Sequence, residues 1–190
     1  PVSGKGQSIK EFKKVYQLLQ QKTISIHLTT KDTNFQEILE STHHNYNLIV
    51  GVGGDGIMYD IVNALQQLQL SIPIAQIPTG SGNGYFKSLT YQTLQPYSIE
   101  TAINIINRQN RCMKTDLLHI TNQENTVDLY SRLSISWGFI SCVDIYTEWL
   151  RKLGAMRFTL GSLWYILQKR KYTGLLEYKN NNNEWKQINS

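Results

Sequence analysis

Cysteine is scarce in this sequence, and its scarcity argues against two kinds of stabilising site. The 190 residues contain two cysteines, Cys112 and Cys142, with no CxxC pairing. A disulfide framework or a zinc site normally needs more cysteines at characteristic spacings, so we expect a packed core instead. The four histidines show no metal-ligand spacing either. A reducing compartment, the cytoplasm, is the expected location.

Long apolar runs and clusters of one charge are also missing. No stretch of about 18 apolar residues occurs, so the sequence predicts no membrane-spanning helix. The net charge is +5, but no run of five or six basic residues forms. Scattered positive charge suits an anionic nucleotide or an anionic membrane surface better than nucleic acid. We therefore expect no nucleic-acid partner.

What the chain does contain is an alternation of strands and helices over its first 110 residues. Short β-branched runs predict strands, and apolar residues at helical spacing predict helices. The expected strands span 24–28, 47–52 and 72–77, and the expected helices span 8–19, 33–41, 57–68 and 98–107. This order predicts an α/β fold with a parallel sheet.

The pattern changes near residue 111. Two strand-like runs over 113–120 and 127–135 have no long helix between them and are expected to pair as a hairpin. Helices are then expected over 145–153 and 158–171, and strands over 174–179 and 184–188. We predict a parallel-sheet domain over residues 1–111, and the first part of a β-rich domain over 112–190. Because the chain begins at Pro1 and stops in a strand-like run, we expect it to be a fragment.

A glycine loop separates the expected strand 47–52 from the helix after it, and carries Asp55 within the run GGDG. Glycines let a backbone approach a ligand closely, and a helix N-terminus attracts phosphate. A carboxylate would repel phosphate, so Asp55 fits such a site if it binds Mg²⁺ or accepts a proton from a hydroxyl. The loop alone is equally compatible with Asp55 as an ordinary helix N-cap.

A second glycine loop, Gly80 to Asn83, follows the next expected strand about 25 residues later. Loops at the carboxyl ends of parallel strands meet at one edge of the sheet, so these two could hold one nucleotide between them. Gly4-Lys5-Gly6 offers a third such loop. None is a Walker A motif, because GxxxxGK[ST] is absent.

The order SGKG, GGDG and PxGSGN resembles the diacylglycerol kinase catalytic domain superfamily, which includes diacylglycerol, sphingosine and ceramide kinases. NAD kinases and phosphofructokinases are more distantly similar in the glycine–aspartate loop, which implies a nucleotide-binding domain of that type. The segments WGFI, VD and LGxMRFTLG, at residues 137–161, look closely like sphingosine kinases. The resemblance extends from Pro1 to about Lys179.

The resemblance implies roles for individual residues. Asp55 matches the catalytic base for the lipid hydroxyl, near Mg²⁺ carried by ATP. Asp144 matches the residue that holds the amino-alcohol head group of the lipid. Contacts with ATP are implied for Gly4, Lys5, Gly6, Thr30, Gly53, Gly54, Gly56, Asp60, Gly80, Ser81, Gly82, Arg151 and Arg157. From the residues alone, Asp144 could equally be a helix N-cap, and the two arginines could equally be solvated.

Three departures bear on the substrate. Asp60 stands where the superfamily usually has glutamate, Ala64 replaces a common glycine, and Cys142 replaces an acidic or small residue two positions before Asp144. Loss of a carboxylate at Cys142 would weaken head-group binding. The end of the β-rich domain, with part of the lipid pocket, is also expected to lie beyond this chain.

The expected function is transfer of the γ-phosphate of ATP, with Mg²⁺, to the primary hydroxyl of a sphingoid base. The alternatives are a ceramide or diacylglycerol kinase, or a catalytically inactive lipid- or nucleotide-binding relative. Lys169 to Lys171, at the end of an expected helix, suit either the helix dipole or peripheral association with a membrane surface. A homodimer is a further possibility that the resemblance leaves open.

Overall fold

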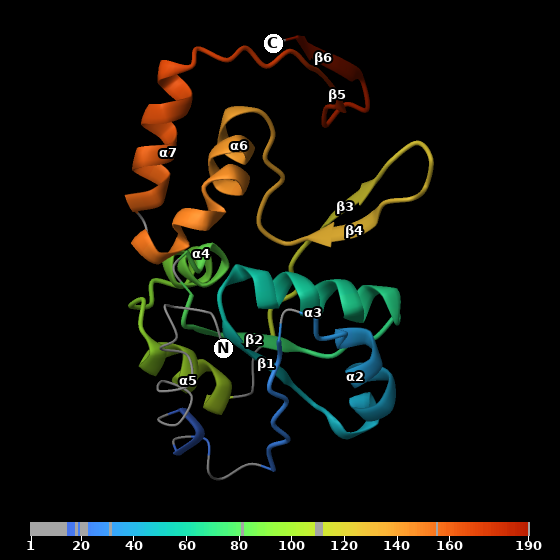
Figure 1. Ribbon diagram of the computed structural model, residues 1–190. Helices are drawn as coiled ribbons and strands as arrows, with labels where there is room; N and C mark the ends of the chain where they lie inside the picture. Colours follow the sequence, from blue (N-terminus) through green and yellow to red (C-terminus); the bar gives the residue numbers. More distant parts are fainter. Residues whose placement is uncertain are drawn as a thin grey trace. The chain divides into compact units, whose positions relative to one another are not determined.

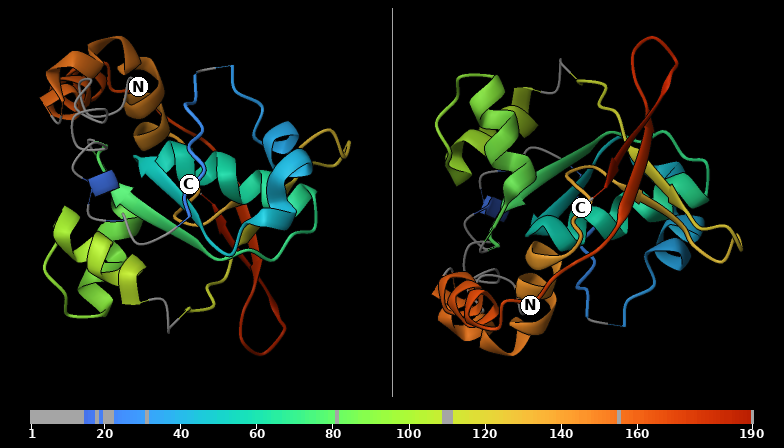
Figure 2. Two further views of the ribbon diagram at one scale, coloured as in Figure 1. Left: turned by 90° about the horizontal axis from the view of Figure 1, so that it is seen from below. Right: turned by 90° about the horizontal axis from the view of Figure 1, so that it is seen from above.

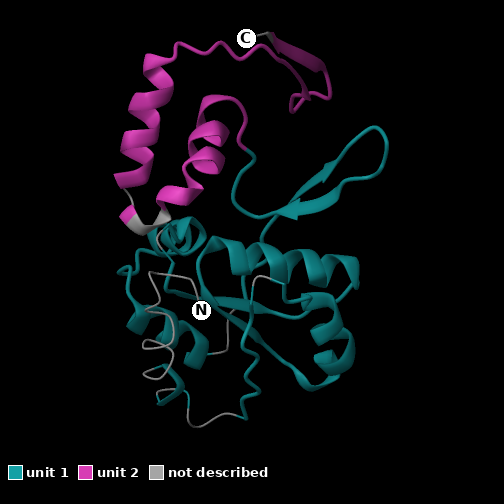
Figure 3. Ribbon diagram, in the orientation of Figure 1, with its two compact units in different colours: residues 1–135 teal, residues 136–190 magenta. Residues whose placement is uncertain are grey.

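The computed structural model describes residues 15–17, 19, 23–30, 32–80, 82–108, 112–154 and 156–189, with the side chains of 151, 152 and 189 left aside. The chain divides into two compact units, residues 1–135 and 136–190 (Figure 3). The predicted domain boundary near residue 111 lies earlier than this division. The intervening hairpin belongs to the first unit because Asn63 bonds to both backbone polar atoms of Tyr130.

The first unit is built on two parallel strands, β1 (Ile49–Gly53) and β2 (Ile74–Pro78), which lie side by side in Figures 1 and 2. The chain between them forms α3 (Asp55–Gln67), as expected for a crossover between parallel strands. Their register pairs Ile49 with Ile74 and Gly53 with Pro78, so both strands end at the same level. The predicted α/β fold with a parallel sheet is therefore confirmed for this unit.

Helices cover the two faces of this strand pair (Figure 1). On one face, Val50 and Val52 pack against a core that includes Ile77 and residues of α5 (Ile99–Arg108). On the other face, Ile49 and Ile74 pack against a core formed by α3 and α2 (Phe35–Thr42). Alternate strand residues thus point to opposite layers, as the two-residue period of a strand requires.

For the other elements of the first unit, the predictions from sequence are confirmed in some cases and wrong in others. The short helix η2 (His43–Asn45) follows α2, and β3 (Leu118–Thr121) pairs with β4 (Asp128–Ser131) as the predicted antiparallel hairpin. The predicted strand over 24–28 is wrong: residues 23–30 form no strand, and their side chains are largely exposed. Helix α4 (Gly84–Gln92) was not predicted, because its buried side chains are only Phe86 and Thr90. Most of the predicted helix 8–19 lies outside the described residues.

The second unit contains α6 (Phe139–Tyr146), the 3-10 helix η3 (Glu148–Leu153), α7 (Met156–Leu167) and a hairpin of β5 (Leu175–Lys179) with β6 (Trp185–Asn189). The two strands predicted over 174–179 and 184–188 are confirmed. The predicted helix over 145–153 is wrong in its bounds: α6 ends at Tyr146, and η3 follows. That region 112–190 begins a β-rich domain stays a prediction.

Candidate functional site

Asp55 lies where β1 gives way to α3, as the first residue of that helix after the N-cap Gly54. Its carboxylate does not cap α3. Oδ2 accepts a hydrogen bond of 2.8 Å from the backbone N–H of Gly84, and Oδ1 accepts one of 3.1 Å from that of Tyr85. These N–H groups begin α4, so Asp55 caps a helix that starts 29 residues further along the chain. Negative charge is favourable at such a helix N-terminus.

The two glycine loops approach each other closely, as predicted for loops at adjacent strand ends. A Cβ atom placed on Gly80 would overlap the Cα atom of Gly54. A Cβ atom on Gly82 would stand 3.3 Å from Asp55 Oδ2. A larger residue at Gly80 would therefore force the backbone to shift, and one at Gly82 would crowd the carboxylate. Beside Gly56, by contrast, a Cβ would meet no atom of the described residues within 4 Å.

The first turn of α4 packs against the residues that follow β4. The guanidinium carbon of Arg132 lies 3.3 Å from the ring centre of Tyr85. A Cβ on Gly84 would stand 2.9 Å from a methyl of Leu133. Burial lowers the pKa of Arg132 to about 10, so its guanidinium stays charged at neutral pH. The turn that binds Asp55 thus also contacts the residues that follow β4.

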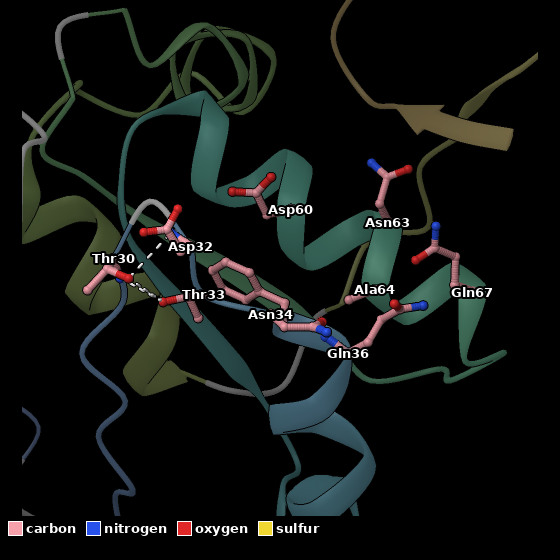
Figure 4. Close-up of a pocket in the computed structure, with 10 residues that line it drawn as sticks. Thr30, Asp32, Thr33, Asn34, Gln36, Asp60, Asn63, Ala64 and Gln67 are labelled. Atoms are coloured by element: carbon pink, nitrogen blue, oxygen red, sulfur yellow. Dashed lines mark hydrogen bonds between the residues drawn. The ribbon is translucent and has the colours of Figure 1, made fainter. Parts of the chain in front are cut away.

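Thr30 and Asp60 line one polar cavity of about 430 Å³ between the segment preceding α2 and the flank of α3 (Figure 4). Thr30 is fixed within a tight turn, where its N–H donates to Thr33 Oγ1 at 2.7 Å and its hydroxyl accepts from the N–H of Asp32 at 3.3 Å. Burial raises the pKa of Asp60 above its ordinary value. The structure therefore brings together two residues predicted to contact ATP although they are 30 positions apart.

In the second unit, Asp144 and Arg157 contact each other directly. Arg157 Nη2 donates to Asp144 Oδ1 at 2.7 Å, and Nη1 donates to Glu148 Oε2 at 2.8 Å. The arginine side chain is 8% exposed, whereas the two carboxylates are 62% and 51% exposed. Asp144 lies inside α6, so its interpretation as an N-cap is wrong. The resemblance implies that Arg157 contacts ATP and that Asp144 contacts the lipid head group. In the structure the two side chains belong to one ion-paired cluster.

The remaining predicted residues fall into two groups. Gly53 ends β1, where its carbonyl accepts hydrogen bonds from Gln76 Nε2 and from the N–H of Thr79. The others lie outside what the structure describes: Gly4, Lys5, Gly6 and Ser81 as whole residues, and Arg151 in its side chain. Their roles stay predictions.

The donor sets bear on how Mg²⁺ could be held. Among the described residues, no group of three or more His, Cys, Asp or Glu side chains could ligate a metal ion. Mg²⁺ usually keeps several waters and is bound through one or two carboxylates together with substrate phosphates. The described residues therefore suit a magnesium ion held together with the nucleotide phosphates, and do not form a separate metal cage.

Comparison with known proteins decides the family. The model of the diacylglycerol kinase catalytic domain matches residues 1–120, which include both glycine loops and Asp55. The chain belongs to this family. Within it, the chain is similar to sphingosine kinase 1 from Rattus norvegicus, 32% identical over 194 aligned residues that cover 94% of this chain and 50% of that protein.

Further relatives have the same character. Sphingosine kinase 1 from Arabidopsis thaliana is 34% identical over 79% of this chain and 32% of its own length. Sphingoid long chain base kinase 5 from Saccharomyces cerevisiae is 32% identical over 67% of this chain and 19% of its own. The predicted resemblance to sphingosine kinases is confirmed. The chain spans about half the length of the rat and human sphingosine kinase 1 proteins that it matches.

Sequence reasoning missed three parts of the site in this family member. It did not anticipate that the N–H groups of Gly84 and Tyr85 bind Asp55, because α4 itself was unforeseen. It overlooked Asn83, although the residue stands in the quoted GSGN motif. It also overlooked Glu148, which follows Asp144 at the four-residue spacing that places side chains on one helical face.

Proposed function

We propose that this chain is the catalytic part of a lipid kinase that transfers the γ-phosphate of ATP to the primary hydroxyl of a sphingoid base. The observation that carries the proposal is the Asp55 carboxylate, which stands between two glycine loops with both oxygens bonded to backbone N–H groups. Similarity to sphingosine and sphingoid base kinases supports the choice of lipid.

Asp55 is the general base in this proposal. A carboxylate has about four lone-pair sites, so each oxygen keeps a further acceptor position beyond its bond to α4. The lipid hydroxyl donates a hydrogen bond to one of these positions. Its oxygen then forms a bond to the γ-phosphorus, and the bond between that phosphorus and the β,γ-bridging oxygen breaks. The hydroxyl proton passes to Asp55 and ADP leaves. The backbone N–H groups of the two glycine loops suit the phosphates.

The cluster of Asp144, Glu148 and Arg157 suits the cationic head group. Both carboxylates are more than half exposed. An ammonium can therefore reach them, and charge-assisted hydrogen bonds would hold it. A neutral lipid, ceramide or diacylglycerol, is the competing substrate, because Arg157 already occupies one oxygen of Asp144.

A membrane surface is the proposed partner. Among the described residues, none of the helices combines the length and apolar character needed to cross a bilayer. The second unit nevertheless exposes large apolar side chains, including Trp149 at 80%, Trp164 at 62% and Leu167 at 76%. Apolar side chains near basic residues suit a peripheral contact with lipid head groups.

The test of this function is phosphate transfer from labelled ATP to sphingosine by the full-length protein, with Asp55→Asn as the comparison. We expect kcat to fall at least about 10³-fold, within the range of general-base catalysis. Circular dichroism and ATP binding establish that the variant remains folded. Equal turnover by both proteins would show that Asp55 is not the general base. Tight ATP binding by the wild type without turnover on any lipid would favour a non-catalytic binding protein.

A further inference from the structure

Asn83 has an unusual place at the start of α4. It is 2% exposed and adopts the left-handed conformation, with φ 54° and ψ 41°. Asparagine is among the preferred N-cap residues, yet its side chain makes no capping hydrogen bond to α4. The side chain is directed back to the preceding loop, where its Oδ1 accepts from the N–H of Gly80 at 3.0 Å. Its Nδ2 donates to the carbonyl of Gly80 at 2.6 Å and to the hydroxyl of Tyr97 at 2.8 Å.

Two residues here share the roles of closing the turn before α4 and of accepting hydrogen bonds from the first N–H groups of that helix. Because the Asn83 side chain holds Gly80, the first N–H groups of α4 remain available to another acceptor. Asp55 is that acceptor, through Gly84 and Tyr85. Asn83 therefore closes the turn that aims these two N–H groups, while the carboxylate that they bind comes from the other glycine loop.

We propose that Asn83 is a positioning residue for Asp55, acting through the backbone N–H groups of Gly84 and Tyr85. This inference rests on the proposed role of Asp55 as the general base. Asparagine suits the position chemically: it tolerates the left-handed conformation, and its amide both accepts from and donates to Gly80. Aspartate keeps the acceptor but loses the donor, and sets a second negative charge near Asp55.

The kinetic test uses Asn83→Gly in the full-length protein, since glycine keeps the left-handed backbone without strain. We expect kcat for phosphate transfer to sphingosine to fall about 100-fold, the scale of a 1 Å misplacement, with both KM values within about threefold of wild type. Asn83→Asp is the second variant, and its kcat should also fall. Asn125→Gly is the matched control, because Asn125 is also left-handed, with φ 54°, and lies in the exposed turn between β3 and β4.

Two readouts separate positioning from a general structural role. If Asn83 acts through Asp55, Asn83→Gly should add no further loss to the residual activity of Asp55→Asn. The amide resonance of Tyr85, identified in ¹⁵N-tyrosine-labelled protein by its loss in Tyr85→Phe, should move in Asn83→Gly and Asp55→Asn alike, and stay in place in Asn125→Gly.

Multiplicative losses in the double variant, or an unmoved Tyr85 resonance in Asn83→Gly, would overturn the proposal. The resonance also distinguishes the two hypotheses from each other. If wild type phosphorylates no lipid while Tyr85 responds to both substitutions, the proposed function fails and the link from Asn83 to Asp55 stands. If phosphorylation depends on Asp55 but not on Asn83, the function stands and the positioning role fails.

Discussion

The two units each present a carboxylate to a proposed ligand, and they hold it by different means. In the first unit, Asp55 accepts hydrogen bonds from two backbone N–H groups, whose positions depend on helix α4. In the second, Asp144 is paired with the guanidinium of Arg157, on a long side chain that also serves Glu148. A carboxylate held by main-chain groups is oriented before substrate binds, whereas one held by a charged side chain can exchange that partner for a ligand cation.

The largest expected effect comes from breaking the main-chain arrangement with Gly80→Ala. The added Cβ would overlap backbone, the Cα atom of Gly54, and backbone cannot rotate away as a side chain can. We expect about 1–3 kcal/mol lower free energy of unfolding, measured by urea denaturation, together with a loss of kcat.

Gly56→Ala is the matched control for that prediction. Its Cβ meets no atom within 4 Å in the part of the chain that the structure describes, and alanine is the better helix former, so unfolding free energy should rise by up to about 1 kcal/mol. ATP binding, measured by calorimetry, should nevertheless weaken if the phosphates lie beside this residue. A variant that is more stable and binds ATP unchanged would remove Gly56 from the nucleotide site.

Substitutions in the ion-paired cluster of Asp144, Glu148 and Arg157 should alter KM for the lipid. We expect Asp144→Asn to raise KM for sphingosine about tenfold, equivalent to about 1.4 kcal/mol of lost binding, because the amide carries no charge to attract the ammonium. Turnover of a neutral lipid should be unaffected. Glu148→Gln is the matched control, since Glu148 accepts the same kind of bond from Arg157. Equal effects of the two substitutions would assign recognition to the charge of the cluster and not to Asp144.

The smallest expected effects concern Asp60, which belongs to neither arrangement. Asp60→Glu restores the longer side chain usual in the superfamily and should lower KM for ATP a few-fold, measured in the same transfer assay. Burial raises the pKa of Asp60, so folding disfavours its charged form. Asp60→Asn should therefore slightly raise Tm at pH 7, and this gain should vanish below about pH 3.9, where aspartate is protonated even in the unfolded chain. A gain that persists at low pH would point to packing instead of charge.

Much of the first unit could be predicted because its signals are local. The strands β1 and β2, the helix α3 and the place of Asp55 between them follow from short apolar runs, helical spacing and glycines. Helix α4 could not be predicted in the same way, since Tyr91 near its end is exposed and only Phe86 and Thr90 are buried. The bond from Asp55 to α4 joins residues that only the packed strands bring together.

The second unit shows a different limit of sequence reasoning. Resemblance assigned a role to each of Asp144 and Arg157 separately, because matched positions carry no information on which side chains contact each other. The pairing depends on α6 and α7, which place residues 13 positions apart within 2.7 Å. The N-cap interpretation of Asp144 failed for a related reason, since α6 begins at Phe139, earlier than its apolar spacing suggested.

The register of β1 and β2 determines where the two glycine loops of the site begin. Gly53 pairs with Pro78, so the two loops leave the strands at the same height. Inserting one residue into either strand would displace its loop by about 3.3 Å and turn every later side chain to the opposite face. Connections away from the two glycine loops can vary in length without such a penalty, but the number of residues in these strands cannot. Insertions and deletions in functional relatives are therefore expected in those other connections, and not within the strands or the two glycine loops.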